Sequence, residues 1–583
     1  MLKLMQHRGS DSFDIFEDEY VILGYCHFKV QKNDSEKRPV SNGKGSIFSM
    51  VDGLIFNYEK MRLLLEKRGY KFYTNTFEEL FIYLYEEMGE EFLKYLKGDF
   101  SFCIYDSSKR LMILGKSLAN NKNIFFTFLN NVFIFSSELK PILLLKDEFK
   151  IDFVSVSNFL TIRHIPFPRT LFENIKRIPP LHLLKIYKKD KNYIFYLSNY
   201  LDINLHTEVK KDERYFIRKI HEYISDIVKQ QLFIVKKPAI FLSGGIDSTT
   251  LLYFLDMYSD EPIETFTIGI KEDLYYARLA SNYFSTSHHE KIPTSDDIFN
   301  MLPTALWYLE TPLAHSGAFL FFLPIISKNH RFVFWAQGNE ELFYGREDYL
   351  ILDKLRKLKS LFPFHVIKLP IVKTFPSKLN FILNLLFSRS DFERYIIFRN
   401  TFNAKEKRLF FNPCLWRSDF YWISFFKDKL SKDILKNYSF LTLTNGFLSD
   451  TFFNINQEVC NPFIDLEFIK FMYSIPSSLK IMNNTKRYLL MKIMKGKIPQ
   501  EILKRKGGRW KFQTYEWIIE QRDRIPIIIE YLKEIKLMNT DINLNALFKK
   551  PDFNKIWSLV TLAILLKIFS NRKYIIGRIN NIL

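Results

Sequence analysis

The sequence predicts two units of different fold class: a sheet-rich α+β unit over residues 1–200, and an α/β unit over residues 213–583 with a parallel, doubly wound sheet and a helical C-terminal extension. The length of 583 residues exceeds what a single hydrophobic core usually serves. Short β-type runs dominate the first unit, whereas strands alternate with helices in the second. The polar stretch LDINLHTEVKKD at 201–212 predicts a linker between them.

The first unit contains several runs rich in β-branched and aromatic residues, which predict strands. These runs are YVILGYCHFKV, GSIFSMVDGLIF, FSFCIYD, RLMILGK and NVFIFSS. Between the second and third runs, apolar residues recur with helical spacing at 58–68 and 77–97. The combination indicates strands and helices in one sandwich-like α+β unit.

In the second unit, an amphipathic helix at 213–234 precedes a buried strand at 238–242. A helix at 249–258, a strand at 264–270 and a helix through 277–284 follow, and the next pair is a helix near 319–327 with a strand at 332–335. Residues 350–450 are mostly helical in pattern. This order predicts a doubly wound parallel sheet.

Composition excludes several classes of protein. The 84 Lys and Arg residues outnumber the 64 Asp and Glu residues, but they are spread along the chain, which argues against a nucleic-acid-binding module. The four cysteines form no CxxC pair, so neither a zinc site nor a disulfide framework is expected and a reducing cytoplasm is the predicted location. The apolar runs 317–326 and 557–566 are too short to span a bilayer and predict buried helices, so no membrane partner is expected.

The loop Ser243-Gly244-Gly245-Ile246-Asp247-Ser248 carries the strongest chemical signal. It lies between a predicted strand and a predicted helix, where an open α/β sheet binds its ligands. The glycines allow close backbone approach, and the N–H groups of the helix start, with the two serine hydroxyls, face an anion. Asp247 would repel bare phosphate, so its presence suggests a bridging Mg²⁺. The alternative is a glycine turn with an N-capping serine.

SGGIDS resembles the pyrophosphate loop of the N-type ATP pyrophosphatases, a superfamily that includes asparagine synthetase, β-lactam synthetase and lasso-peptide cyclases. Further segments resemble asparagine synthetase in the family's own order. These segments are TFTIGI with EDLYYARLASNYFSTSHHE (272–290), GNEELFYG (338–345), EVCNPFID (458–465) and KRYLLMKIMKGKIPQEILKRKGG (486–508). The resemblance therefore covers nearly the whole chain and implies an ATP-pyrophosphatase domain over 213–583.

The first unit resembles the glutaminase domain of class II glutamine amidotransferases, which have the N-terminal-nucleophile fold. The segments that resemble it are HRGSD (7–11), VDGLIFN (51–57), GDFSFCIYD (98–106) and SSELK (136–140). The resemblance also implies what has changed. The family's nucleophilic cysteine follows the initiator Met, and Leu2 stands there.

Three internal positions point the same way. The family's oxyanion-hole Asn aligns with Asp52, which adds a negative charge where an oxyanion must form. The arginine that binds the glutamine carboxylate aligns with His27, and the aspartate that binds its amine aligns with Phe77. We therefore expect a degenerate glutaminase domain, as in β-lactam synthetase and lasso-peptide cyclases.

For the second unit, the resemblance implies that ATP binds with its phosphates on the loop and Mg²⁺ between Asp247 and Glu340. Phe241 and Ile268 match positions whose backbone contacts adenine. Trp335 replaces a small residue near the ribose, and Ala336 is a further position expected to bind the nucleotide.

The residues nearest the reaction depart from the family pattern. The family's SGEG is here Trp335-Ala336-Gln337-Gly338, so an acid near the substrate has become neutral Gln337. The lysine that stabilises the intermediate aligns with Arg487, and Lys486 could serve after a shift of one residue. The arginine of the ExRxPFLD motif has become Cys460. These changes, Gln337 in particular, predict an acceptor or a nucleophile other than those of asparagine synthesis.

Three functions remain open at this point. The first is an ATP-dependent amide ligase that activates a small-molecule or peptide carboxylate as an acyl-adenylate, with ammonia or an amine as the nitrogen donor. The second is a lasso-type peptide macrolactam cyclase. The third is a non-catalytic ATP-binding scaffold protein. A homodimer is the oligomeric state that the resemblance suggests.

Overall fold

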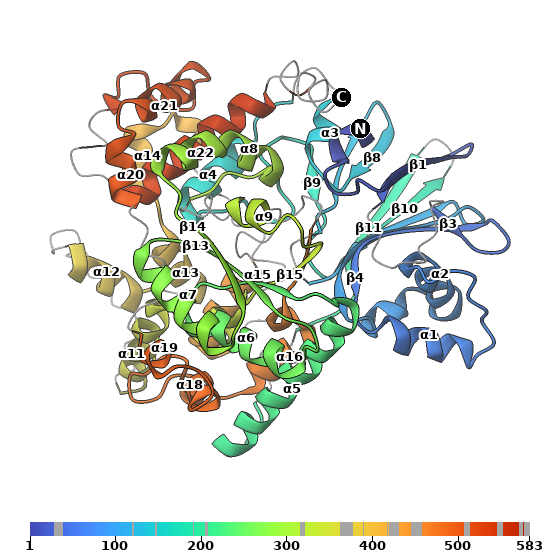
Figure 1. Cartoon of the computed structure of the whole chain (residues 1–583). Helices are drawn as coiled ribbons and strands as arrows, with labels where there is room; N and C mark the ends of the chain where they lie inside the picture. The colour runs from blue at the N-terminus through green and yellow to red at the C-terminus, as the bar shows by residue number, and fades with distance from the viewer. Residues whose placement is uncertain are drawn as a thin grey trace.

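The computed structural model describes the chain except for residues 28–38, 119–121, 146–148, 190–191, 204–207, 315–320, 362–376, 389, 417, 419–430, 445–456, 506–513, 545–547, 549–551, 571–574 and 576–583. In Figure 1 the N-terminal unit, drawn in blue and cyan, lies beside a larger body built from the green-to-red remainder of the chain. The predicted α+β unit followed by a parallel α/β unit is confirmed.

The N-terminal unit is built on antiparallel sheets. A six-stranded sheet has the order β11-β10-β6-β5-β4-β3, a three-stranded sheet the order β8-β7-β9, and β1 pairs with β2. The strands are β1 (Ser12–Glu17), β2 (Ile22–His27), β3 (Val40–Ser41), β4 (Ile47–Ile55), β5 (Gly98–Asp106), β6 (Leu111–Lys116), β7 (Phe125–Leu129), β8 (Val132–Ser136), β9 (Lys176–Arg177), β10 (His182–Lys189) and β11 (Asn192–Asn199).

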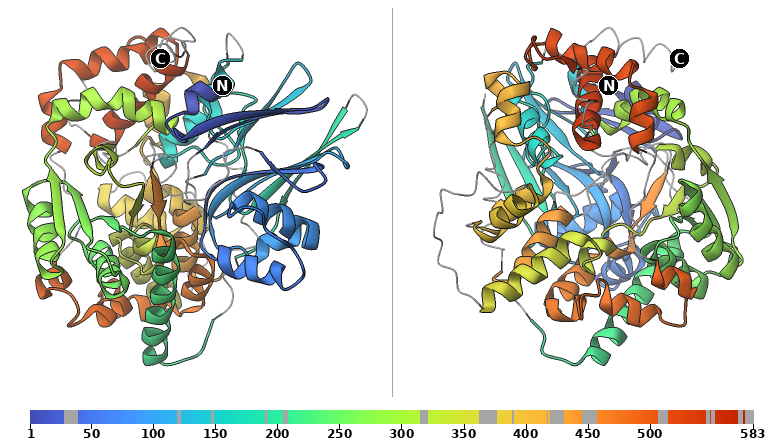
Figure 2. Two further views of the ribbon diagram at one scale, coloured as in Figure 1. Left: turned by 45° about the vertical axis from the view of Figure 1, so that its right-hand side comes forward. Right: turned by 90° about the vertical axis from the view of Figure 1, so that its left-hand side faces the viewer.

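Apolar residues cover both faces of the larger sheet. One face packs on the other sheets through buried Leu23, Met50, Leu114, Ile178 and Leu184. The opposite face is covered by α1 (Tyr58–Glu66) and α2 (Phe77–Met88), with the 3₁₀ turn η2 (Gly89–Lys94) (Figure 2). This confirms the helices predicted at 58–68 and 77–97. Strand β1 was not predicted, because its exposure alternates without a fully buried face.

The remaining elements of this unit lie toward the second unit. They are η1 (Leu2–Met5), α3 (Lys140–Leu143) and α4 (Phe153–Ile162). Leu4, Leu139 and Phe159 belong to the same buried cluster as Trp307 and Leu566 of the second unit. A continuous core therefore joins the two units.

The second unit contains a five-stranded parallel sheet of order β14-β13-β12-β15-β16. Its strands are β12 (Ala239–Phe241), β13 (Glu264–Ile268), β14 (Ser287–Lys291), β15 (Phe332–Phe334) and β16 (Glu458–Cys460). The chain moves outward from β12 in one direction and then returns to add β15 and β16 on the other side. The switch point lies between β12 and β15, where such sheets bind ligands.

Helices surround this sheet. Those near it are α5 (Glu213–Ile234), α6 (Ile246–Tyr258), α7 (Lys271–Tyr283), α8 (Ser295–Leu309) and α9 (Phe322–Ile326). Helix α6 begins at Ile246, before the predicted residue 249, because Gly245 takes the extended N-cap conformation and Asp247 lies in the first turn. Strand β16 was not predicted, because only three residues of EVCNPFID pair with β15.

The other described segments of the unit are mostly helical, which agrees with the prediction for residues 350–450 where that range is described. These helices are α10 (Asn339–Leu342), α11 (Glu347–Leu361), α12 (Ser377–Leu386), α13 (Asp391–Arg399), α14 (Ala404–Phe410), α15 (Ile434–Thr444), α16 (Leu466–Ser474), α17 (Ser477–Lys480), α18 (Tyr488–Met494), α19 (Gln500–Lys504), α20 (Thr514–Glu520), α21 (Arg524–Glu534) and α22 (Phe553–Phe569), with the 3₁₀ turns η5 (Pro413–Leu415) and η8 (Pro462–Ile464).

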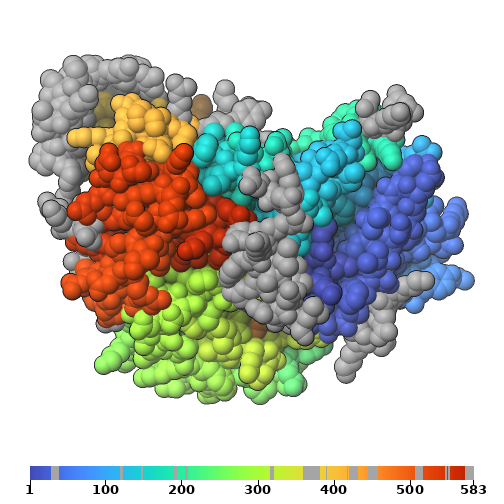
Figure 3. Space-filling model, turned by 90° about the horizontal axis from the view of Figure 1, so that it is seen from above, coloured from blue at the N-terminus to red at the C-terminus, as the bar shows by residue number. Residues whose placement is uncertain are grey.

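The apolar run at 557–566 lies inside α22 and is buried, as expected. Seen from above, the orange and red C-terminal helices lie close to the cyan part of the N-terminal unit (Figure 3). Within the described residues, no helix is both long and apolar enough to cross a membrane. Part of the predicted helix near 319–327 falls on residues 315–320, outside the described residues; α9 is its described part.

Candidate functional site

The loop between β12 and α6 requires glycine at its first turn. Gly244 has φ of +66°, a conformation that side chains rarely adopt. A Cβ atom at this position would lie 2.4 Å from the amide N of Ala277 and 2.6 Å from the carbonyl C of Tyr276 on α7. Gly244 is therefore required both by its backbone angle and by the close approach of α7. Gly245 has neither restriction, since the nearest atom to its Cβ position is Ser243 Oγ at 3.4 Å.

The two serines of the loop bind each other. Ser243 Oγ and Ser248 Oγ are 3.0 Å apart, and the Ser243 amide donates to Ser248 Oγ at 3.2 Å. The Gly245 amide donates to Ser243 Oγ at 3.4 Å. These contacts hold the loop curved around the N-terminus of α6, a position that favours an anionic ligand.

Asp247, in the first turn of α6, forms an ion pair with Arg487, which lies 240 residues later in the sequence. Arg487 Nη2 lies 2.6 Å from Asp247 Oδ2, and Nε lies 3.1 Å from Oδ1. The same Nη2 atom is 3.5 Å from Glu340 Oε1. Asn339 Nδ2 donates to Asp247 Oδ1 at 3.0 Å. The two acids that the sequence predicts as metal ligands therefore both contact the guanidinium of Arg487.

Electrostatics explain this arrangement. Burial raises the pKa of Asp247, and the nearby positive charge of Arg487 opposes that rise. Burial acts in the opposite sense on Arg487, but the carboxylates of Asp247 and Glu340 raise its pKa above the ordinary value. The guanidinium therefore stays charged between the two acids.

The structure separates the two basic residues that the sequence left as alternatives. Arg487 has φ of +53° immediately before α18, and its Nη1 donates to the carbonyl of Gly345 at 3.1 Å. A Cβ atom on Gly345 would lie 2.3 Å from Arg487 Cζ, so this glycine makes room for the guanidinium. Lys486 turns away and forms an ion pair with Glu347. Of the two, only Arg487 enters the site.

The segment after β15 lies at the same edge of the sheet. The amide of Trp335 donates to the carbonyl of Cys460 at 2.9 Å, which keeps the chain beside β16. Ala336 and Gln337 follow, and Gly338 turns the chain into α10 with φ of +86°. Phe241 ends β12 on the other side and is buried.

Ile268 ends β13 and is also buried. Register confirms the proximity of the two strands, since Phe241 pairs with Phe266. The structure therefore brings the predicted nucleotide-contact positions to one edge of the sheet.

Sequence reasoning gave no role to Arg505, although it lies in the 486–508 block. Its Nη2 is 2.6 Å from Asp273 Oδ1 on α7, and its Nη1 donates to the carbonyl of Ser243 at 3.4 Å. Its guanidinium lies over the ring of Tyr276 at 4.3 Å. Arg505 thereby ties the loop to α7 from behind. The sequence signal for Arg505 was its place among the basic residues that follow IPQEIL, and its burial is known only from the structure.

The N-terminal unit contains a pocket formed around the positions that align with glutaminase residues. It is lined by Met5, Arg8, Gly24, Tyr25, Cys26, His27, Val51, Asp52, Gly53, Asn75, Thr76, Phe77, Glu78, Ser137 and Glu458. His27, Asp52 and Phe77, which are far apart in sequence, thus share one pocket. Glu458 comes from the second unit, so the pocket lies at the boundary between the units.

Two cations hold Asp52. Arg8 Nη2 lies 2.7 Å from Oδ2 and Lys122 Nζ lies 2.8 Å from Oδ1. Burial acts to raise the pKa of Asp52, but Arg8 and Lys122 hold it below the ordinary value. Asp52 is therefore a carboxylate rather than a neutral acid. Cys26 is the thiol in this pocket, and burial raises its pKa to about 11.

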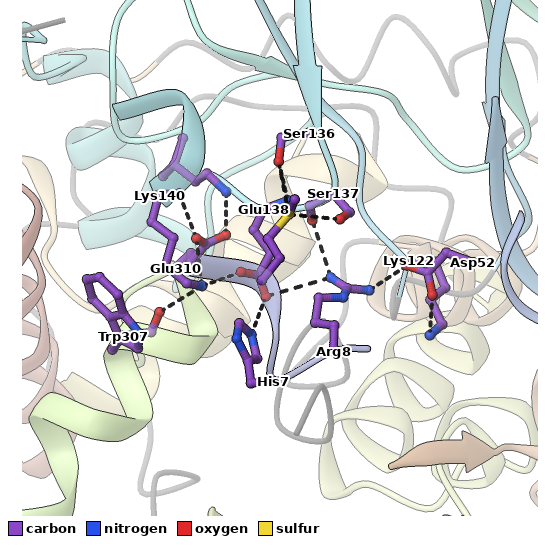
Figure 4. A network of polar contacts seen from close by, with 12 residues as sticks. His7, Arg8, Asp52, Lys122, Ser136, Ser137, Glu138, Lys140, Trp307 and Glu310 are labelled. Atoms are coloured by element: carbon purple, nitrogen blue, oxygen red, sulfur yellow. Dashed lines mark hydrogen bonds and ion pairs between the residues drawn. The ribbon is translucent and has the colours of Figure 1, made fainter. Parts of the chain in front are cut away.

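A buried network of charges continues from this pocket to the second unit (Figure 4). His7 Nε2 lies 2.7 Å from Glu138 Oε1, and Lys140 Nζ lies 2.5 Å from Glu138 Oε2. Lys140 also reaches Glu310 at the end of α8, with Nζ 3.2 Å from Oε1. Glu310 in turn accepts hydrogen bonds from the amides of Leu139 and Lys140 at 2.6 and 2.8 Å.

Burial acts to raise the pKa of Glu138, but His7, Lys140 and Arg8 together hold it far below the ordinary value. The charges in the network are thus paired, as buried charges must be.

The candidate metal position is built from oxygen atoms. Within the described ranges, no group of three or more His, Cys, Asp or Glu side chains could hold a metal ion. Asp247 and Glu340 supply two carboxylates, and the buried Oδ1 of Asn339 accepts no hydrogen bond from any described residue. This set fits a hard cation such as Mg²⁺, which uses one or two carboxylates and takes its remaining ligands from phosphates and water.

Two known families match parts of this chain. The family described as "Asparagine synthase" matches residues 219–567, and the family described as "Glutamine amidotransferase domain" matches residues 1–200. A relative from Bacillus subtilis (strain 168), asparagine synthetase [glutamine-hydrolyzing] 1, is 24% identical over 98% of this chain and 94% of its own length.

Asparagine synthetase [glutamine-hydrolyzing] 3 of the same strain is 24% identical over 95% of this chain and 92% of its own length. Asparagine synthetase B [glutamine-hydrolyzing] of Escherichia coli (strain K12) is 24% identical over 62% of each chain.

Proposed function

Because the chain belongs to the asparagine synthase family, we propose that it is an ATP-dependent ligase that activates a carboxylate as an acyl-adenylate and converts it to an amide. Family membership implies the use of ATP and an asparagine-synthetase-like amidation. We further propose that the carboxylate is that of a small molecule or a peptide, and that ammonia or an amine donates the nitrogen. The absence of a working glutaminase is also part of the proposal.

The observation that carries the proposal is the loop at the switch point of the sheet. Its curved backbone, the two hydroxyls of Ser243 and Ser248 and the N-terminus of α6 form a cradle for phosphate groups. Arg487 adds a positive charge at the mouth of this cradle. Such preorganised donors stabilise the charge that develops on a transferring phosphoryl group.

The reaction then has two steps. An oxygen of the substrate carboxylate attacks the α-phosphorus, and the bond to the leaving pyrophosphate breaks. A nitrogen nucleophile next attacks the acyl carbon, the bond to the AMP oxygen breaks, and the nitrogen loses a proton. Arg487 cannot accept that proton because its guanidinium does not deprotonate, and Gln337 has no basic group. Both residues therefore serve in binding and charge stabilisation rather than as a base.

Asp247 and Glu340, with Asn339 Oδ1, would hold the divalent cation that accompanies ATP. When bound, that cation neutralises phosphate charge and favours departure of pyrophosphate. The side chains themselves position the loop and the start of α10 against each other, through the Asn339–Asp247 hydrogen bond of 3.0 Å.

We propose that glutamine is not the nitrogen source. The Asp52 carboxylate, fixed by Arg8 and Lys122, lies in the pocket where a glutaminase must stabilise an oxyanion, and a negative charge there opposes that step. The thiol of Cys26, with its pKa raised to about 11, is not a reactive thiolate at neutral pH. Free ammonia or an amine on the substrate then supplies the nitrogen.

Gln337 favours an acceptor other than aspartate, because the neutral amide replaces the acid that the family pattern has near the substrate. A peptide carboxylate attacked by an amine of the same peptide, as in a lasso-type macrolactam cyclase, is one such acceptor. A non-catalytic scaffold that only binds ATP is the alternative of a different class. The closed ion pair between Arg487 and Asp247 is the observation that favours it.

A pyrophosphate-release assay separates these functions. The protein is incubated with ATP, Mg²⁺ and ammonium against a panel of carboxylates that includes aspartate, and separately with glutamine in place of ammonium. We expect carboxylate-dependent release with ammonium and none with glutamine. ATP binding without release across the panel supports the scaffold. Steady formation of glutamate from glutamine contradicts the loss of glutaminase activity.

A variant pair tests the site assignment. Asp247→Ala should reduce pyrophosphate release by about 100-fold or more, because it removes the central carboxylate of the site. Asp256→Ala changes an exposed carboxylate near the end of the same helix and should leave release unchanged. Equal activity of the two variants contradicts the assignment of the loop.

A further inference from the structure

We propose that Arg487 and a divalent cation compete for the same two carboxylates, so that in the nucleotide-free protein Arg487 acts as an internal substitute for the cation. The inference rests on the proposed function only in assuming that the loop binds a metal–nucleotide complex. It assigns to Arg487 a second state in addition to its role in charge stabilisation: it closes the acid pair until nucleotide and cation arrive together.

Arg487 occupies the carboxylate oxygens of Asp247 that a cation would need. Both of its carboxylate oxygens are already engaged, since Arg487 Nε and Nη2 lie 3.1 and 2.6 Å from Oδ1 and Oδ2. Asn339 Nδ2 adds a further donor to Oδ1 at 3.0 Å. A parallel two-point contact of this kind is the strongest geometry that an arginine makes with a carboxylate. A cation cannot bind these oxygens while the guanidinium remains in place.

The carboxylates of Asp247 and Glu340 need a positive charge between them. Arg487 Nη2 lies between Asp247 and Glu340, 2.6 Å from the first carboxylate and 3.5 Å from the second. The side chains of Arg487 and Asp247 are only 17% and 21% exposed, so solvent screens the Asp247 carboxylate poorly. Without a positive charge at this point the two carboxylates would repel each other. Either the guanidinium or a metal ion must supply that charge.

The side-chain oxygen of Asn339 is a third oxygen atom available to a cation. Asn339 is fully buried, and its Oδ1 atom has no hydrogen-bond partner among the residues that the structure describes, although the same side chain donates to Asp247. A buried acceptor without a hydrogen bond lowers the stability of the fold. Its presence beside two carboxylates therefore points to a metal ion that the three oxygen atoms can coordinate. Two carboxylates and one amide oxygen are too few to hold Mg²⁺ tightly alone, which makes nucleotide phosphates necessary.

Arg487 can release Asp247 and still stay close to the loop that binds the phosphates. Its backbone has φ of +53° immediately before α18, and besides the two carboxylates it donates to the carbonyl of Gly345. The Glu340 side chain is 43% exposed, so this side of the ion pair faces solvent. Released from Asp247, the guanidinium still lies beside the loop that holds the phosphates. Binding of cation and nucleotide would thus be coupled through one residue.

The test uses Mn²⁺ as the probe and the full-length protein. Free Mn²⁺ is measured by electron paramagnetic resonance during titration, with and without a non-hydrolysable ATP analogue. We expect the wild-type protein to bind Mn²⁺ tightly only with the analogue. Arg487→Met should bind Mn²⁺ without nucleotide about tenfold or more tightly than wild type, because the acid pair is then uncompensated. Arg487→Lys keeps the positive charge but loses the two-point contact, so its affinity for Mn²⁺ should lie between those of wild type and Arg487→Met.

Two results overturn the inference. One is nucleotide-independent binding of Mn²⁺ by the wild-type protein that Asp247→Asn abolishes, and this measurement does not depend on whether Arg487→Met folds. The other is a folded Arg487→Met protein that binds Mn²⁺ no better than wild type. The inference and the proposed function fail separately, because a protein that shows the competition but never releases pyrophosphate would refute the ligase alone.

Discussion

Lys122 Nζ lies 2.7 Å from Glu458 Oε1, and this ion pair joins the N-terminal unit to strand β16 of the parallel sheet. The same ammonium is 2.8 Å from Asp52 Oδ1, in the pocket of the N-terminal unit. Strand β16 pairs with β15, and β15 leads into Trp335 and the candidate site. The amidotransferase-like unit is therefore held against the sheet by buried charge as well as by the shared apolar core.

The first prediction concerns this ion pair. Lys122→Met should lower the free energy of unfolding by about 3 kcal/mol, because it leaves Asp52 and Glu458 facing each other without their shared cation. Urea unfolding followed by circular dichroism measures the change. Lys94→Met breaks an exposed ion pair with Glu91 and should cost less than about 1 kcal/mol. Similar costs for both variants would show that the Lys122 contacts contribute nothing special to stability.

The second prediction uses the two glycines of the loop as a matched pair. Gly244→Ala places a Cβ 2.4 Å from the Ala277 amide at φ of +66°, so the loop must move away from α7. A displacement of about 1 Å should lower kcat/KM for ATP by about 100-fold. Gly245→Ala meets only Ser243 Oγ at 3.4 Å and should retain most of the activity. Pyrophosphate release at varied ATP gives both values, and a reversed order of the two variants would contradict the loop geometry.

The third prediction concerns Arg505, which supports the loop from behind. Arg505→Gln loses the ion pair with Asp273 and the contact with the Ser243 carbonyl. The loop then binds ATP less well, and we expect KM for ATP to rise about tenfold with a smaller change in kcat. Arg505→Lys should recover part of the loss through Asp273.

Arg278→Gln is the control for this prediction, since it breaks an exposed ion pair with Glu290 elsewhere on α7. An unchanged KM for ATP in Arg505→Gln would mean that the loop keeps its shape without this support.

The fourth prediction is a pH dependence of stability at Lys407. This buried amine donates to the carbonyl and Oγ of Ser157 at 2.9 and 2.7 Å and to Ser418 Oγ at 2.8 Å, and no ion pair joins it in the described part of the chain. Burial lowers its pKa to about 7, from an ordinary value of 10.5. Between these values the unfolded chain binds a proton that the folded chain does not, so this residue makes the fold more stable as pH rises.

The comparison of variants isolates this effect. Relative to Lys407→Met, wild type should gain roughly 1 kcal/mol of stability per pH unit above about pH 7.5. Lys405→Met, exposed on the same helix, should follow wild type at every pH. Urea unfolding from pH 7 to 9 measures the difference, and parallel curves for Lys407→Met and wild type would exclude a neutral Lys407.

Much of the fold follows from local pattern. Helix α5 spans the predicted residues 213–234, and strands β12 and β13 lie within the predicted 238–242 and 264–270, because hydrophobic period and turn residues act over short distances. Short strands escaped prediction for the opposite reason. Strand β16 exists only because residues 458–460 find β15, a partner more than a hundred residues away in sequence.

The candidate site divides in the same way. The phosphate-binding loop at 243–248 could be predicted from the sequence because the residues that define it are six consecutive ones. The choice between Lys486 and Arg487 was not readable, since adjacent residues differ only in the direction that the backbone gives them. The positive φ of Arg487 and the space left by Gly345 direct the guanidinium to Asp247, while Lys486 pairs with Glu347.

Local pattern accounts for most of the helices, for strands β12 and β13, for the phosphate-binding loop and for the residues that depart from the family pattern. The ion pairs that hold Asp52 between Arg8 and Lys122, and that bring Arg487 onto the acid pair, are visible in the folded chain alone. Charge pairing in a buried site depends on distances of a few ångströms between distant segments. Those distances are set by packing of the whole chain and by no local pattern.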